Sequence, residues 1–155
     1  CGIGQKTCYA CKFEILRPAV LLFRMRQTWQ WQNNPVSDYI SCIGNALEKT
    51  GFTSVRFNES GDFTDVSCIK KLSSIAKACP SITFFGYTAR RDLYRKGYFN
   101  DVPENVVLTG SGFMIHNEFG PYYKNTVGKV DCPGNCGDCN LCKERKLHVI
   151  YNPLH

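Results

Sequence analysis

The stretch SVRFNESGDFTDVSCIKKLSSIAKACPSITFFGYT, residues 54–88, carries the pattern that decides the fold. Its two ends, Ser54–Asn58 and Ile82–Thr88, are rich in β-branched and aromatic residues, and the second is apolar enough for burial on both faces of a sheet. Between them, Asp65 precedes a segment whose apolar residues recur at helical spacing until Pro80. A strand, a helix and a strand in succession predict parallel pairing with a right-handed crossover.

The same alternation extends to both sides of this unit. Upstream, the sequence predicts a helix over 12–31, with Pro18 suited to a first helical turn, and a second helix from Ser37 or Asp38 to Lys49. Downstream, it predicts one short helix and two strands, over 93–98, 106–109 and 147–151. The long stretch 110–146 is expected to be irregular.

These elements favour an α/β fold: a small, mostly parallel βα-repeat sheet or partial barrel. The 155 residues fit a single domain, 1–155. Because the chain begins at Cys1 without a methionine, we expect further residues upstream, and because Cys1–Cys11 precedes a helix in a βα pattern, we expect a first strand among them. No apolar stretch approaches the roughly 20 residues of a membrane span, so no membrane partner is expected. The protein is expected to be a monomer.

Seven of the ten cysteines fall into two clusters near the two ends of the chain, Cys1, Cys8 and Cys11 in the first and Cys132, Cys136, Cys139 and Cys142 in the second. Glycine, asparagine and aspartate separate the cysteines of the second cluster, and such residues allow tight turns that aim several sulfurs at one point. Thiolate is a soft ligand that selects zinc, copper(I) or iron–sulfur clusters.

The C-x-x-C-x-x-C spacing from Cys136 to Cys142 matches the run that supplies three ligands to a cubane cluster. A single zinc ion more often takes two C-x-x-C pairs from distant segments. The sequence therefore predicts one [4Fe-4S] cluster that joins the N- and C-terminal segments, with zinc as the alternative. Clustering and chain length argue against a disulfide framework. The other three cysteines, Cys42, Cys68 and Cys79, are interpreted as buried apolar residues within helices.

Polar residues follow the predicted strands, and functional loops in parallel sheets lie at the carboxyl ends of strands. Glu59 and Asp62 follow the first strand, and Arg90 follows the second. We expect them at the rim of the metal site as candidate cofactor-binding residues, although turn capping and ion pairing would explain them equally. The net charge is +6, from 19 Lys and Arg against 13 Asp and Glu. This charge could attract nucleic acid, but no nucleic-acid-binding motif accompanies it, which favours a solvated basic surface.

A resemblance to the bacteriophage "gene product eighty-eight" family runs through nearly the whole chain, carried in order by Cys8–Cys11, Val55–Asp62, Phe84–Thr88, Cys132–Cys142 and Tyr151–His155. It implies a phage-encoded protein, made in the host cytoplasm, that carries an iron–sulfur cluster. The resemblance names a class of protein rather than an activity. A closed cluster bound only by thiolates suits a redox, electron-transfer or structural role, with an unknown redox partner.

A weaker likeness to radical-SAM enzymes lies in a βα pattern with cysteines after an expected first strand and an acidic motif after the second. That superfamily uses C-x-x-x-C-x-x-C in one loop. Here only Cys8 and Cys11 match this spacing, because Cys1 lies seven residues before Cys8. Three functions thus remain open: an iron–sulfur protein, a radical-SAM-like enzyme, and a zinc-stabilised nucleic-acid-binding module.

Overall fold

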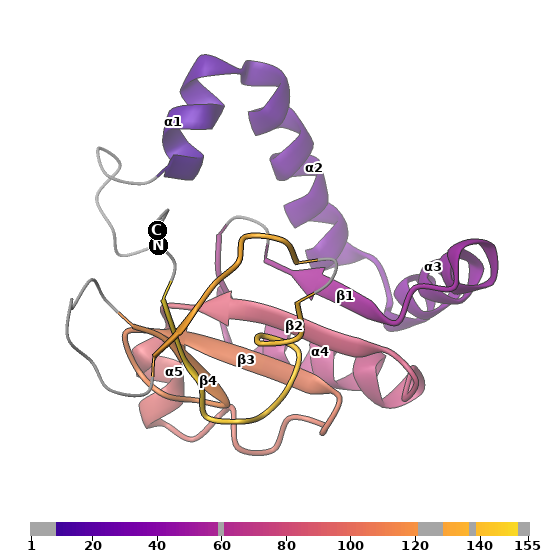
Figure 1. The fold of residues 1–155 in the computed structure, drawn as a ribbon. Helices are drawn as coiled ribbons and strands as arrows, with labels where there is room; N and C mark the ends of the chain where they lie inside the picture. The colour runs from indigo at the N-terminus through magenta and orange to yellow at the C-terminus, as the bar shows by residue number, and fades with distance from the viewer. Residues whose placement is uncertain (1–8, 59–60, 121–128, 137–138, 152–155) are drawn as a thin grey trace.

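The computed structural model describes residues 9–58, 61–120, 129–136 and 139–151 of the chain (Figure 1). Within these ranges the helices are α1 (Tyr9–Leu16), α2 (Pro18–Asn33), α3 (Val36–Thr50), α4 (Val66–Ala78) and α5 (Arg91–Arg95). The strands are β1 (Ser54–Phe57), β2 (Thr83–Thr88), β3 (Val106–Ser111), β4 (Asn117–Phe119), β5 (Lys129–Asp131) and β6 (Val149–Tyr151).

The strands form one six-stranded sheet in the order β1-β2-β3-β4-β6-β5, and every neighbouring pair is parallel. Helix α4 connects β1 to β2, and α5 lies between β2 and β3 in the chain. The α/β class and the parallel βαβ unit predicted over 54–88 are therefore confirmed. Within the described ranges the sheet is open and does not close into a barrel.

One face of the sheet is closed by apolar packing against α4. The helix begins after Asp65, whose carboxylate accepts a hydrogen bond from the Ser67 backbone N–H at 2.6 Å, as predicted for its N-cap. The core between helix and sheet includes Ile69, Leu72, Ile75, Phe84, Val106 and Leu108. Complete burial of one such side chain contributes about 1.5–3 kcal/mol, so hydrophobic burial dominates this face.

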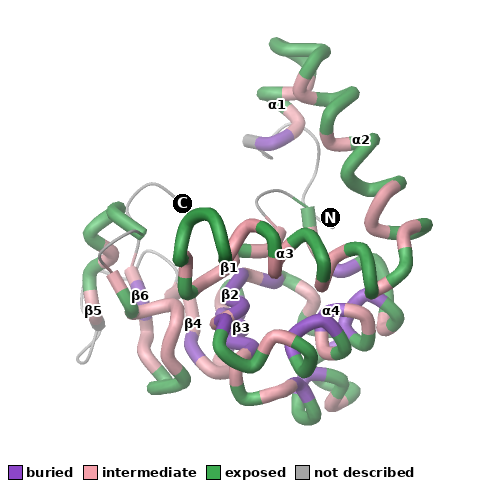
Figure 2. The backbone as a smooth tube through the Cα atoms, turned by 90° about the vertical axis from the view of Figure 1, so that its right-hand side faces the viewer, coloured by how far each residue is buried: buried purple, intermediate pink, exposed green. Residues whose placement is uncertain are grey.

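Helices α1 and α2 form a hairpin that stands away from the sheet (Figure 2). Its base is attached through Trp31, whose ring meets Tyr39 edge-on at 5.2 Å and lies 5.0 Å from the Lys71 ammonium. Large apolar side chains are exposed along it, namely Phe13, Ile15, Leu16, Leu21, Leu22, Phe23, Met25 and Trp29. None of the described helices combines the length and apolarity needed to cross a bilayer.

Three details differ from the expectations. The helix expected over 12–31 is split at Arg17, because Pro18 starts α2 at its first position. The stretch expected to be irregular contains β4 and β5, each only three residues long. Cys42 is exposed on α3, so its interpretation as a buried residue is wrong, whereas Cys68 is buried as expected.

Candidate metal centre

The loop that joins β5 to β6, described at 132–136 and 139–148, covers the face of the sheet opposite α4 (Figure 1). Its four cysteines line one cavity of about 20 Å³, together with the sheet residues Phe85, Tyr87 and Ile150. Successive side chains of a strand point to opposite faces, so Phe84 belongs to the α4 core while Phe85 lies under the cysteines. The structure thus brings together the four C-terminal cysteines predicted as metal ligands, Cys132, Cys136, Cys139 and Cys142.

Hydrogen bonds from the sheet hold this loop in place. Asn117, fully buried on β4, accepts from the His148 backbone N–H at 3.0 Å and donates to the Glu144 carbonyl at 2.7 Å. The Cys132 N–H donates to the Tyr151 carbonyl at 2.7 Å. Because these bonds fix both ends of the loop, the cysteines stay over the sheet without a helix or strand of their own.

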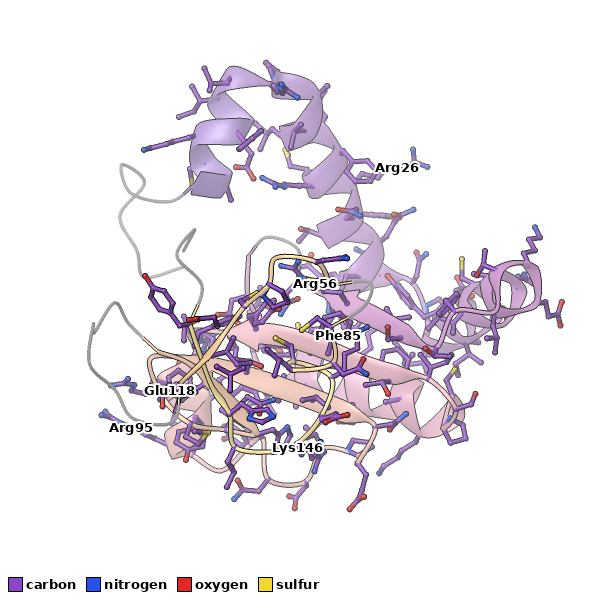
Figure 3. All side chains as sticks on the ribbon, in the orientation of Figure 1. Arg26, Arg56, Phe85, Arg95, Glu118 and Lys146 are labelled. Carbon is purple, nitrogen blue, oxygen red and sulfur yellow. The ribbon has the colours of Figure 1, made fainter. Side chains whose placement is uncertain are left out.

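Tyr87 is the polar residue in the floor of the cavity. Its hydroxyl donates a hydrogen bond to Cys142 Sγ over 3.4 Å. Burial raises the pKa of Tyr87 well above its usual value, and the bond to Cys142 raises it further, so the phenol keeps its proton. The Arg56 guanidinium carbon lies 4.9 Å from the centre of the Tyr87 ring, on the face that the loop covers (Figure 3).

The sulfurs are close enough to influence one another. Burial raises the pKa of the Cys142 thiol, and the neighbouring sulfurs of Cys132, Cys139 and Cys136 raise it further, while the bond from Tyr87 opposes them. A bound metal would displace the thiol protons and neutralise the repulsion between neighbouring thiolates. Besides Arg56, a second cation lies near the cavity: the Lys143 ammonium is 5.8 Å from the centre of the Phe85 ring.

The donor set fits a thiolate-bound metal or iron–sulfur cluster, since cysteine sulfur is the ligand that both prefer. All the described cysteines are free of disulfides. Across the described ranges, no three His, Cys, Asp or Glu side chains are yet arranged to hold an ion. Binding of a metal therefore requires the side chains of the four cysteines to rearrange around it.

Of the three N-terminal cysteines, the structure describes only Cys11. Cys11 lies on α1 and is not among the residues that line the cavity. Cys1 and Cys8 fall outside the described residues. The predicted joining of both chain ends by one centre therefore stays a prediction.

Of the candidate rim residues, Asp62 and Arg90 lie where the loops after β1 and β2 meet. Asp62 accepts hydrogen bonds from the Thr88 hydroxyl at 2.7 Å and the Ala89 N–H at 2.6 Å. Arg90 donates to the backbone carbonyls of the β1–α4 loop and to both oxygens of the Asp92 carboxylate. These contacts brace the two loops against each other. Glu59 lies outside the described residues, and a binding role for the three remains a prediction.

Sequence reasoning missed two residues of the site. Tyr87 could have been found from the sequence. It lies two residues after Phe85 in a strand predicted to be buried on both faces, so it points to the same face as Phe85, and its buried hydroxyl needs a hydrogen-bond partner there. Asn117 carries none, since a single asparagine in a glycine- and asparagine-rich stretch usually indicates a turn.

The chain matches the Gene product 88 family over residues 1–135. The protein belongs to this family of phage gene products. The match ends at Asn135, so it includes the three N-terminal cysteines and Cys132 but stops before Cys136. No curated protein and no solved structure matches the chain. The resemblance stated from the sequence is confirmed for the family.

Proposed function

We propose that this member of the Gene product 88 family is a metalloprotein whose cysteine loop binds one [4Fe-4S] cluster, in a redox or structural role. The observation that carries the proposal is the gathering of all four C-terminal cysteines around one cavity. Cys132, Cys136, Cys139 and Cys142 would hold the cluster. Four thiolates are the ligand set of a closed cubane cluster, which takes up and releases single electrons.

The protein's own residues support a partly buried redox site. Phe85 and Ile150 provide an apolar floor that limits access of water, and Tyr87 donates a hydrogen bond to one sulfur. Arg56 and Lys143 lie over the rings of Tyr87 and Phe85 and supply positive charge beside the thiolates. Positive charge and hydrogen bonds stabilise the added negative charge of a reduced centre.

A single zinc ion is the second candidate, favoured by the size of the cavity. A volume of about 20 Å³ accommodates roughly one water-sized sphere, which suits one ion coordinated by four thiolates. A cubane cluster is larger and requires the loop to move outward. Zinc would give the loop a purely structural role.

Metal analysis after purification without oxygen tests the proposal. The expected protein is brown, contains about four irons and four sulfides per chain, and bleaches on reduction. A Cys136→Ala/Cys142→Ala variant should lose the colour, whereas Cys8→Ala/Cys11→Ala should retain it if the C-terminal cysteines suffice. Colourless protein with one zinc per chain would establish the second candidate, and protein free of both metals would refute both.

The radical-SAM alternative differs from this proposal in the number of cysteine ligands to the cluster. Those enzymes leave one iron open for S-adenosylmethionine, whereas four cysteines around one cavity can close the site. Addition of S-adenosylmethionine to the reduced protein should leave its electron paramagnetic resonance spectrum unchanged. A spectral shift and formation of 5′-deoxyadenosine would favour the enzyme.

A further inference from the structure

Tyr87 occupies a defined position beneath the cysteines. Its ring is held between Phe119, 4.6 Å away between ring centres, and Arg56, 4.9 Å from its centre. From this position the hydroxyl reaches Cys142 Sγ at 3.4 Å, within the range of a hydrogen bond to sulfur. The contact joins the carboxyl-terminal end of β2 to a residue 55 positions later in the chain.

We propose that Tyr87 is a positioning residue that raises the reduction potential of the metal centre through its hydrogen bond to Cys142. The inference rests on the proposed function and deepens it, because it names the residue that tunes the cluster. When the centre gains one electron, negative charge accumulates on the sulfurs and strengthens the O–H···S bond.

The surroundings of Tyr87 strengthen this effect. Burial beside Phe85 and Ile150 lowers the local dielectric, and a hydrogen bond to a charged sulfur counts for more there than in water. Arg56 lies on the Tyr87 ring and adds a cation on the same side. The hydroxyl also orients the Cys142 side chain towards the cavity, so its loss should weaken metal binding as well as shift the potential.

Tyr87→Phe removes the hydroxyl and keeps the ring, and Tyr98→Phe is the matched control because Tyr98 is exposed. Both variants should hold a full cluster when they are reconstituted with excess iron and sulfide, so that their potentials can be compared. Electrode titration of the purified holoproteins should give a more negative potential for Tyr87→Phe and an unchanged potential for Tyr98→Phe. Equal potentials in all three proteins, with full clusters, would overturn the inference while leaving the cluster itself established.

A second measurement applies if the wild type holds zinc. Competition with a chelator should then show zinc affinity about tenfold lower in Tyr87→Phe than in wild type and Tyr98→Phe, as for other losses of a partner to a metal ligand. Equal zinc affinities in the three proteins would overturn the proposed positioning role of Tyr87. A wild type that binds neither iron nor zinc would instead refute the proposed function, and the inference with it.

Discussion

The two faces of the sheet are closed by different kinds of interaction. Behind the sheet, α4 buries a continuous apolar core against β2 and β3. In front, a loop without regular structure carries the four cysteines and Lys143, is anchored by Asn117 of β4, and faces Arg56 of β1 on the Tyr87 ring. Parallel sheets are normally covered by apolar layers on both faces. We infer that the helix face is stabilised mainly by apolar burial, whereas the loop face depends more on directional bonds and on the proposed metal centre.

Loss of a ligand should produce the largest effect and test the loop face directly. Cys139→Ala should abolish metal binding and lower Tm by about 10–20 °C, because ligation free energy is also folding free energy. Cys79→Ala, on the helix face, should cost only about 1 kcal/mol by leaving a small cavity. Thermal unfolding of both variants checks this, and equally mild effects would remove the structural role of the centre.

Truncation in the core should test the helix face. Phe84 is 2% exposed, so Phe84→Ala should lower the free energy of unfolding by about 3–5 kcal/mol. The loss should be the same in metal-loaded and metal-free protein, as measured by urea denaturation. A loss that depends on metal would show that the two faces are coupled through the strand.

Two asparagines form a matched pair across the sheet. Asn105 donates to the carbonyls of Ala76, Cys79 and Ile82 on the helix side, and Asn117 anchors the cysteine loop. Replacement of either by Ala should cost about 2–3 kcal/mol, because buried polar groups lose their partners. Only Asn117→Ala should also reduce the metal content per chain. Equal metal content in the two variants would contradict the anchoring role of Asn117.

The smallest predicted effect is a pH dependence at His116, whose Nδ1 accepts a hydrogen bond from the Leu108 N–H at 3.0 Å. Burial, with a smaller contribution from the Arg145 charge, lowers the pKa of His116 to about 4. The unfolded chain binds this proton near pH 6.5 and the folded protein only near pH 4. Stability should therefore be constant above neutrality and fall by about 1–2 kcal/mol between pH 7 and 4.

His116→Gln, which keeps a hydrogen-bond acceptor, should flatten this profile in urea denaturation of metal-free protein. A slope that is identical in the variant and the wild type would assign the pH dependence to other groups.

The sequence predicted the parts of the molecule that depend on local pattern. The βαβ unit over 54–88 and the Asp65 cap follow from periodicity and capping chemistry, and cysteine spacing singled out the four residues that line the cavity. Strands β4 and β5 could not be predicted, because a segment of three residues is too short to show a periodic pattern. Their pairing with β6 stabilises them as strands in the folded protein. The contact between Tyr87 and Cys142 joins distant segments, so only the folded chain reveals it.

The position of the cysteine loop between β5 and β6 has a consequence for the order of folding. Strands β1 to β3 and α4 meet through contacts that are near in the chain, whereas β6 must insert between β4 and β5. Pairings of distant segments form late, so the ligands converge only after the first half of the sheet exists. Insertion of the proposed metal would then be a late maturation step. A cell short of metal would accumulate chains in which α4 is packed on the sheet but the cysteine loop does not cover Phe85. Chaperones and proteases recognise exposed apolar surface of this kind.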